Sequence, residues 1–164
     1  MWNFLMGGLH LGMTLVLYDG HPGYPDLGTL WRFIQETGVT YFGTSAPFIQ
    51  GCMKAGIEPA REFDLVSLKG LGSTGAPLPP EGFQWVYEKV KSDLLLNSLS
   101  GGTDICTGIV GACPLLPVHA GEIPCRLLGA SVEAYDEQGH SVVDEVGELV
   151  ITAPMPSMPG RCGC

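Results

Sequence analysis

Short apolar runs alternate with stretches of helical periodicity along the first 115 residues of the chain. The apolar runs predict four strands, at residues 14–18, at 39–42, at 65–71 and from residue 94 onward. Between these runs, apolar residues spaced three and four apart predict three crossover helices. Strands that alternate with helices are typical of a parallel sheet. The pattern therefore predicts an α/β fold with a mostly parallel sheet over about residues 10–115.

The ends of the predicted helices are marked by residues with known positional preferences. Asp26 is placed to cap the first helix, and Gly38 is placed to stop it. Prolines begin the other two helices, at Pro47 and at Pro79 with Pro80, positions where a missing N–H has no cost.

The pattern changes after about residue 120, where short apolar runs are separated by turn residues and no helical stretch occurs. This texture is typical of a β meander or partial barrel, expected over about residues 120–154. We therefore expect an α/β part over residues 1–118, a β-rich partial barrel over 119–155, and a disordered or non-native tail over 156–164.

The acidic charge of the chain argues against two classes of binding partner, nucleic acids and anionic membranes. Lys and Arg total 8 against 17 Asp and Glu, which gives a net charge of −9. Clustered Lys and Arg supply the affinity for nucleic acids and for anionic membranes, so we expect neither partner. Only 15% of the residues are charged, against about 25% in typical soluble domains. This low charged fraction predicts that the chain is part of a larger protein and that many of its residues are buried there.

Residues 1–18 are strongly apolar but lack the basic start and the cleavage site of a signal peptide. The run is also shorter than the roughly 20 residues that a membrane span requires. We interpret it as a buried core segment.

The six cysteines form no CxxC pair, which argues against zinc, and no secretion signal favours disulfides. We expect reduced thiols in a cytoplasmic protein. A thiol or metal function of Cys106, Cys113 and Cys125 is retained as a further hypothesis.

Two loops of small hydroxyl and glycine residues each follow a predicted strand, over residues 72–77 and 98–104. Ligands of open parallel sheets bind at the carboxyl ends of the strands. Glycines let a backbone approach a ligand closely, and hydroxyls with free amides bind phosphate. Asp104 could hold Mg²⁺ together with substrate phosphates. The alternative is that both loops are simple tight turns.

Three segments then resemble a known family: STGAPL (73–78), SGGTD (100–104) and GELVITAP (147–154). In this order and spacing they are similar to the adenylate-forming acyl-CoA synthetase superfamily. Longer strings, such as YFGTSAPFI (41–49), resemble the members that activate acetoacetate, and the similarity covers residues 1–159. The resemblance implies a two-step reaction in which ATP adenylates a carboxylic acid and CoA displaces AMP, with Mg²⁺ as cofactor.

The resemblance also implies roles for individual residues. The adenine would pack on Gly75, Ala76 and Pro77. The phosphates would lie along Ser100, Gly101, Gly102 and Thr103, with Thr103 contacting the α-phosphate. Asp104 stands where the family usually has a Glu near Mg²⁺, so Thr103 and Asp104 are the catalytic candidates and Asp104 is the metal candidate.

The acid would lie against Met1, Thr74 and Gly101. Related acetyl-activating enzymes place a Trp where Gly101 stands, so a glycine there is consistent with a longer acid such as acetoacetate.

The family's phosphate loop and its C-terminal domain with a catalytic lysine lie outside the matched segment. We therefore expect the isolated chain to be an inactive fragment of the ligase. The alternative is a non-catalytic module that binds a nucleotide or a partner.

Overall fold

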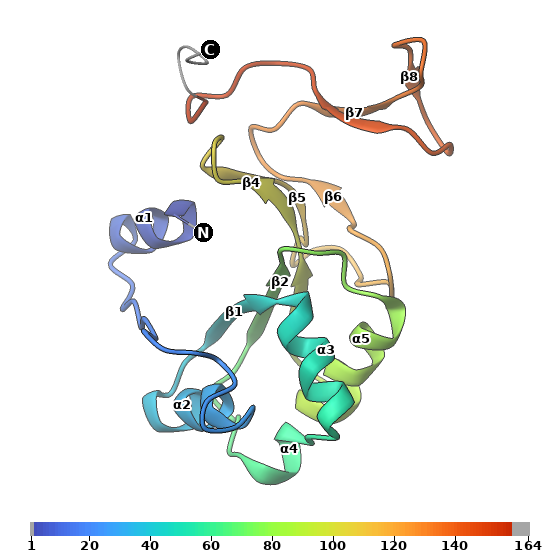
Figure 1. The fold of residues 1–164 in the computed structure, drawn as a ribbon. Helices are drawn as coiled ribbons and strands as arrows, with labels where there is room; N and C mark the ends of the chain where they lie inside the picture. Colours follow the sequence, from blue (N-terminus) through green and yellow to red (C-terminus); the bar gives the residue numbers. More distant parts are fainter. Residues whose placement is uncertain (1, 159–164) are drawn as a thin grey trace.

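The computed structural model describes residues 2–158 of the chain. A three-stranded parallel sheet and its helices are followed by two small antiparallel sheets (Figure 1). The helices are α1 (Trp2–His10), α2 (Thr29–Thr37), α3 (Ala46–Ala55), α4 (Pro59–Glu62), α5 (Pro80–Trp85) and the π-helical η1 (Val86–Val90). The strands are β1 (Tyr41–Ser45), β2 (Gly70–Thr74), β3 (Leu95–Ser98), β4 (Ser100–Gly102), β5 (Thr107–Gly111), β6 (Cys125–Arg126), β7 (Val132–Tyr135), β8 (Ser141–Val142) and β9 (Glu148–Ile151).

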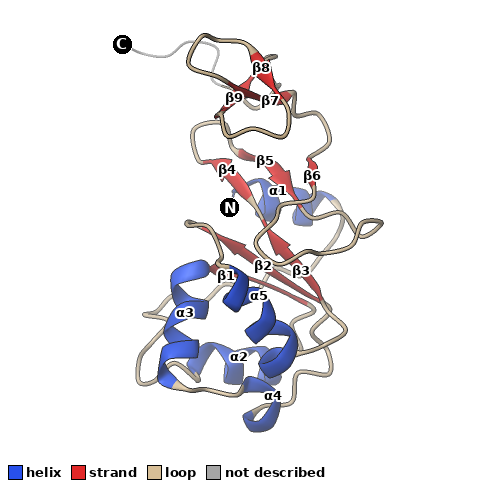
Figure 2. Cartoon of the chain, turned by 90° about the vertical axis from the view of Figure 1, so that its right-hand side faces the viewer, coloured by secondary structure: helices blue, strands red, loops and turns tan. Residues whose placement is uncertain are grey.

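The parallel sheet has the order β1-β2-β3, and helices connect each strand to the next. Helices α3 and α4 lie between β1 and β2 in the sequence, and α5 and η1 lie between β2 and β3. Figure 2 shows α2, α3 and α5 gathered on one side of this sheet. This arrangement confirms the predicted α/β class with crossover helices.

The main hydrophobic core lies between the sheet and these helices. Phe42, Leu71 and Leu96 contribute to it from the three parallel strands. Trp31 of α2 is fully buried, and its ring centroid lies 5.5 Å from that of Phe42 and 6.3 Å from that of Trp85. Each aromatic pair of this kind adds about 0.5–1.5 kcal/mol beyond the burial of its area. The core therefore fixes the helices against one face of the sheet.

The helix ends largely follow the sequence signals. Gly38 ends α2 in the left-handed conformation, with a φ of 65°. Ser45 caps α3 by accepting the N–H of Phe48 at 3.3 Å. Asp26 accepts the N–H of Gly28 at 2.8 Å, so it holds the turn before α2 while Gly28 occupies the cap position.

The prediction of a strand at residues 14–18 is wrong, because that segment has no regular structure. The prediction that residues 1–18 form a buried core segment is also wrong for the described part. Leu11 and Leu17 are 79% and 69% exposed. A strand needs a neighbour to satisfy its backbone N–H and C=O groups, and none of residues 2–158 pairs with this segment. The parallel sheet consequently has three strands.

The second half of the chain is antiparallel. Strands β4 and β5 form a hairpin that the sequence pattern did not predict, and β6 pairs with β5. Strand β7 lies between β8 and β9, which confirms the β-rich texture predicted after residue 120. A small second core of Ile109, Val132 and Met155 connects the two antiparallel sheets. Within the described residues, no helix is long and apolar enough to cross a membrane.

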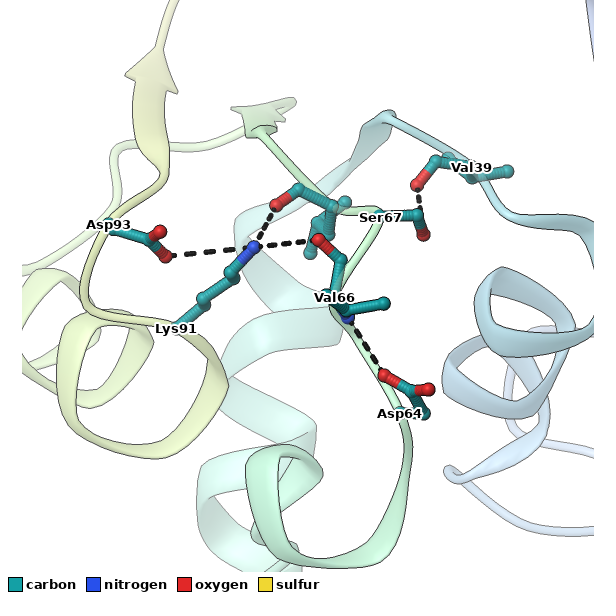
Figure 3. A network of polar contacts seen from close by, with 7 residues as sticks. Val39, Asp64, Val66, Ser67, Lys91 and Asp93 are labelled. Carbon is teal, nitrogen blue, oxygen red and sulfur yellow. Dashed lines mark hydrogen bonds and ion pairs between the residues drawn. The ribbon is translucent and has the colours of Figure 1, made fainter.

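The amino-terminal edge of the parallel sheet is held by a polar network (Figure 3). The Lys91 ammonium donates to the carbonyl oxygens of Val66 at 3.0 Å and Leu68 at 2.8 Å, and it lies 3.6 Å from the Asp93 carboxylate. Ser67 donates its hydroxyl to the Val39 carbonyl at 3.1 Å. These contacts fix the chain just before each of the three strands begins.

Glu58 connects the segment around α4 to η1. Its carboxylate accepts a hydrogen bond from Lys89 of η1 and pairs with Arg61 of α4. The hydrogen bond from Lys89, together with the charge of Arg61, lowers the pKa of Glu58 below its usual value of 4.5.

We predict that Glu58→Gln lowers the free energy of unfolding at pH 7. A pKa that is lower in the folded state means that the ionised carboxylate stabilises the fold above the unfolded-state pKa. That contribution is lost as the pH falls through the folded-state pKa, so the difference from wild type should vanish in acid. Urea denaturation at several pH values measures it, and a difference that persists unchanged below about pH 3 would contradict the assignment.

Candidate functional site

The carboxyl ends of β2 and β3 lie side by side, and both predicted loops leave the sheet there. Ser73 of β2 is in register with Ser98 of β3. The N–H of Leu99, just past the end of β3, donates to the Ser73 carbonyl at 3.0 Å. The sheet therefore brings the bases of the two loops together, as the sequence predicted.

The first loop begins where β2 ends at Thr74. Gly75 follows with a φ of 84°, a conformation that glycine adopts without the cost paid by residues with a Cβ. Gly75, Ala76 and Pro77 are exposed, whereas Leu78 is buried and anchors the end of the loop. The three residues expected to pack on adenine thus form one open turn.

The second loop is a β-hairpin. Ser100, Gly101 and Gly102 form β4, and Thr103 and Asp104 begin the four-residue turn that leads to β5. The turn is closed by the N–H of Cys106, which donates to the Thr103 carbonyl at 3.0 Å. Thr103 and Asp104 are therefore exposed at the tip of the hairpin, away from the base where the two loops meet.

The candidate site is consequently an open edge of the sheet. Two hollows of about 270 and 250 Å³ are formed elsewhere in the described residues, and neither is lined by a residue of the predicted site. The first is lined by residues that include Phe83 and Tyr87, and the second by residues that include Phe63 and Lys91.

The residues expected to contact the acid are distributed around this edge. Thr74 is half-buried at the last position of β2, and Met1 lies outside the described residues. A Cβ added to Gly101 would lie 2.3 Å from the Thr107 carbonyl oxygen and 2.6 Å from the Cα of Gly108. The strand register shifts at this point to pair Gly101 with Gly108. The missing side chain at 101 is thus what lets the two strands of the hairpin approach each other.

A polar contact that no sequence pattern predicted lies across the other face of the parallel sheet. Asn97 of β3 donates its amide Nδ2 to the Tyr41 hydroxyl of β1 at 3.2 Å, and its Oδ1 accepts the N–H of Ala112 at 2.8 Å. Partial burial of the ring raises the pKa of the Tyr41 hydroxyl, and the hydrogen bond from Asn97 partly offsets this. The two partners are 56 positions apart in the sequence, so no local pattern signals their contact.

A glycine pattern in the sequence lies at the residues that the Tyr41 ring contacts. The string GLGSTG at residues 70–75 has the spacing of a glycine-rich nucleotide loop. In the structure Gly70 and Gly72 belong to β2 instead, and the Tyr41 ring lies against them. These glycines therefore make room for an aromatic ring.

The three cysteines of the thiol or metal hypothesis are separate free thiols. Cys125 donates its thiol to the Gly111 carbonyl at 3.3 Å. Across residues 2–158, no three His, Cys, Asp or Glu side chains gather in a way that could hold a metal ion.

Comparison with known proteins gives related sequences along nearly the whole chain. The chain is 48% identical to acetoacetyl-coenzyme A synthetase of Rhizobium meliloti and 42% identical to acetoacetyl-CoA synthetase of Xenopus tropicalis. Both matches extend over 159 residues, which are 97% of this chain and 24% of the relative. The chain thus spans about a quarter of the length of these curated relatives.

Solved structures agree with this result. Acetoacetyl-CoA synthetase from Streptomyces lividans superposes with a TM-score of 0.87 at 50% identity, over 96% of this chain and 25% of that one. The anthranilate CoA ligase AuaEII superposes with a TM-score of 0.76 at 18% identity, which shows the fold alone. The profile of the AMP-binding enzyme family matches residues 1–160. The chain therefore belongs to the AMP-binding enzyme family.

Proposed function

We propose that this chain carries the adenylate-binding part of an ATP-dependent acid–thiol ligase that activates acetoacetate and transfers it to CoA. The observation that carries the proposal is the 48% identity to an acetoacetyl-coenzyme A synthetase, which extends over 159 residues and so includes both loops of the candidate site. The adjacent carboxyl ends of β2 and β3 support it, because ligands of open parallel sheets bind at such an edge.

The proposed reaction has two steps. The acid carboxylate attacks the α-phosphorus of ATP, which releases pyrophosphate and leaves an acyl-adenylate. The thiol of CoA then attacks the acyl carbon, and AMP departs. Displacement at phosphorus depends mainly on positioning and on stabilising the developing charge.

In this proposal each loop binds one part of the adenylate. The open turn of Gly75, Ala76 and Pro77 receives the adenine ring. Ser100, Gly101 and Gly102 lie beside the phosphate, and the Thr103 hydroxyl donates to an α-phosphate oxygen. Because this turn and these glycines are exposed, the backbone can approach the ligand closely.

Asp104 is the residue that would hold Mg²⁺. A single exposed carboxylate suits this cation, which is commonly bound by one or two carboxylates together with substrate phosphates. When bound, Mg²⁺ supplies charge neutralisation at the phosphates. The chain's own part is to place the Asp104 carboxylate next to Thr103 at the tip of the hairpin.

We place the protein in the cytoplasm. The free thiols of Cys52, Cys106, Cys113 and Cys125 support this, because reducing compartments keep thiols unpaired.

We predict that the 164-residue chain binds AMP weakly and does not turn over acetoacetate, ATP and CoA. Its net charge of −9 repels nucleotides, and it spans only about 24% of its relatives. Calorimetry with AMP and Mg²⁺ should give a weak signal that Thr103→Ala and Asp104→Ala abolish. The matched controls Thr37→Ala and Asp93→Ala, placed far from the loops, should leave it unchanged.

Two results would count against this proposal. AMP binding that survives both loop substitutions would place the nucleotide elsewhere. Micromolar AMP binding without any turnover would favour the non-catalytic binding module.

We predict that Gly101→Ala destabilises the hairpin whereas Gly102→Ala is tolerated. At 101 the new Cβ meets backbone atoms at 2.3 and 2.6 Å, whereas at 102 the nearest atom is Cγ1 of the Ile105 side chain at 3.3 Å. Gly101→Ala should cost about 1–3 kcal/mol, and Gly102→Ala about 0.5 kcal/mol or less. Urea denaturation compares the two, and equal costs would show that Gly101 is not required by the strand pairing.

A further inference from the structure

The Tyr41 hydroxyl is held at a defined point on the sheet face that the core helices leave uncovered. A Cβ added to Gly70 would lie 2.7 Å from the Tyr41 ring, and one added to Gly72 would lie 2.5 Å from the Tyr41 hydroxyl oxygen. The ring therefore lies flat across β2, with its hydroxyl over Gly72. As a whole residue, Tyr41 is 38% exposed.

The hydrogen bonds of Asn97 determine which way the Tyr41 hydroxyl acts. The N–H of Ala112 can only donate, so the Asn97 atom that faces it is the carbonyl Oδ1. The amide Nδ2 then faces Tyr41 and donates to its hydroxyl oxygen. Because that oxygen already accepts a hydrogen bond, the Tyr41 proton is free to be donated to another acceptor. The raised pKa of Tyr41 keeps this proton in place at neutral pH.

This hydroxyl lies on the same face of the sheet as the candidate acid site. Residues two apart on a strand point to the same face, so Thr74 lies directly beyond Gly72 on β2. Helix α1 covers the same face, since its Phe4 ring stacks on Tyr41 at 6.2 Å. Figure 1 shows α1 on the side of the parallel sheet opposite α3 and α5. Thr74 and the Tyr41 hydroxyl over Gly72 thus lie on one face of β2.

The distance along β2 between Thr74 and Gly72 suits a short acid that carries a ketone oxygen besides its carboxylate. Two residues of a strand span about 6.6 Å, which separates the level of Thr74 from the level of Gly72. The ketone carbon of a 3-oxo acid lies about 2.5 Å from its carboxyl carbon. The carbonyl bond and a hydrogen bond of about 2.8 Å extend this reach to about 6.5 Å. A carboxylate at the carboxyl edge therefore brings a 3-oxo group within reach of Tyr41.

We propose that the Tyr41 hydroxyl donates a hydrogen bond to the ketone oxygen of a 3-oxo acid, and that Asn97 is the positioning residue that leaves its proton free. This inference rests on the proposed function and adds a determinant of substrate choice. It explains how the site would distinguish acetoacetate from butyrate, an acid of the same chain length without the ketone. A site with such a donor favours the ligand that can pair with it.

The test compares two stable adenylate analogues, acyl-sulfamoyl adenosines that carry an acetoacetyl or a butyryl group, in titrations of the 164-residue chain followed by NMR. Wild type should bind the acetoacetyl analogue about five- to tenfold more tightly. Tyr41→Phe should bind the two analogues equally, because only the hydroxyl is removed. Tyr87→Phe, which changes a tyrosine in a different hollow, should keep the wild-type ratio.

Asn97→Asp separates a positioning role from a structural one. The Asp carboxylate can still accept the Ala112 N–H, but its second oxygen accepts the Tyr41 proton instead of donating to its oxygen. The preference for the acetoacetyl analogue should then disappear although Tyr41 is intact. Because each variant is judged by the ratio of two analogues, a general change in affinity or stability cancels.

The outcomes separate this inference from the proposed function. If AMP alone shifts the amides of Gly75, Ala76 and Thr103 but wild type binds both analogues equally, the inference is overturned and the proposed function stands. A preference that survives Tyr41→Phe also overturns the inference. If neither AMP nor the analogues shift these amides, the nucleotide site is wrong and both proposals fail.

Discussion

The parallel hydrogen-bonded pairing of β2 with β3 is the constraint on which the rest of the molecule depends. It sets Ser73 beside Ser98, and Leu99 continues the pairing one residue beyond the strand. Twenty residues of chain, 78–97, separate the two loops in the sequence, yet this register makes them neighbours at one edge. The core helices pack against one face of the sheet and stabilise its strands. The polar network around Lys91 stabilises the amino-terminal edge of the sheet. The chemistry proposed for the edge therefore rests on backbone pairing, with loop side chains adding the specific contacts.

Several glycines of β2, β4 and the turn after β2 act by leaving space or by adopting a left-handed conformation. Gly101 lets β4 approach the backbone of β5, and Gly70 with Gly72 leaves room for the Tyr41 ring. Gly75 supplies a left-handed turn at the end of β2. The sequence pattern assigned Gly72, Gly75 and Gly101 to two candidate ligand loops, and in the structure each of them has a packing or backbone role. Rigid placement of this kind is what a site needs if it is to select ligands by one or two hydrogen bonds.

The sequence was informative where a local pattern determines the structure. Alternating apolar and periodic segments led to the parallel sheet, and Gly38 and Pro47 marked helix ends. The strands predicted at 39–42 and 65–71 are displaced to Tyr41–Ser45 and Gly70–Thr74. Small residues such as those of GLGST carry little strand propensity, and their pairing with neighbours decides the outcome. For the same reason the pattern did not reveal β4, which consists of Ser100, Gly101 and Gly102.

Features that depend on distant contacts were beyond the sequence. The apolar residues 14–18 predicted a strand, but a local pattern cannot show whether a neighbouring strand pairs with it, and none of the described residues does. The contact between Tyr41 and Asn97 likewise joins separate strands. The most direct test of the whole account is the set of NOE contacts between bound AMP and the chain. We expect contacts from the adenine protons to the Ala76 methyl group and from the ribose to the Thr103 methyl group. Contacts that fall instead on Tyr87, or on only one of the two loops, would contradict it.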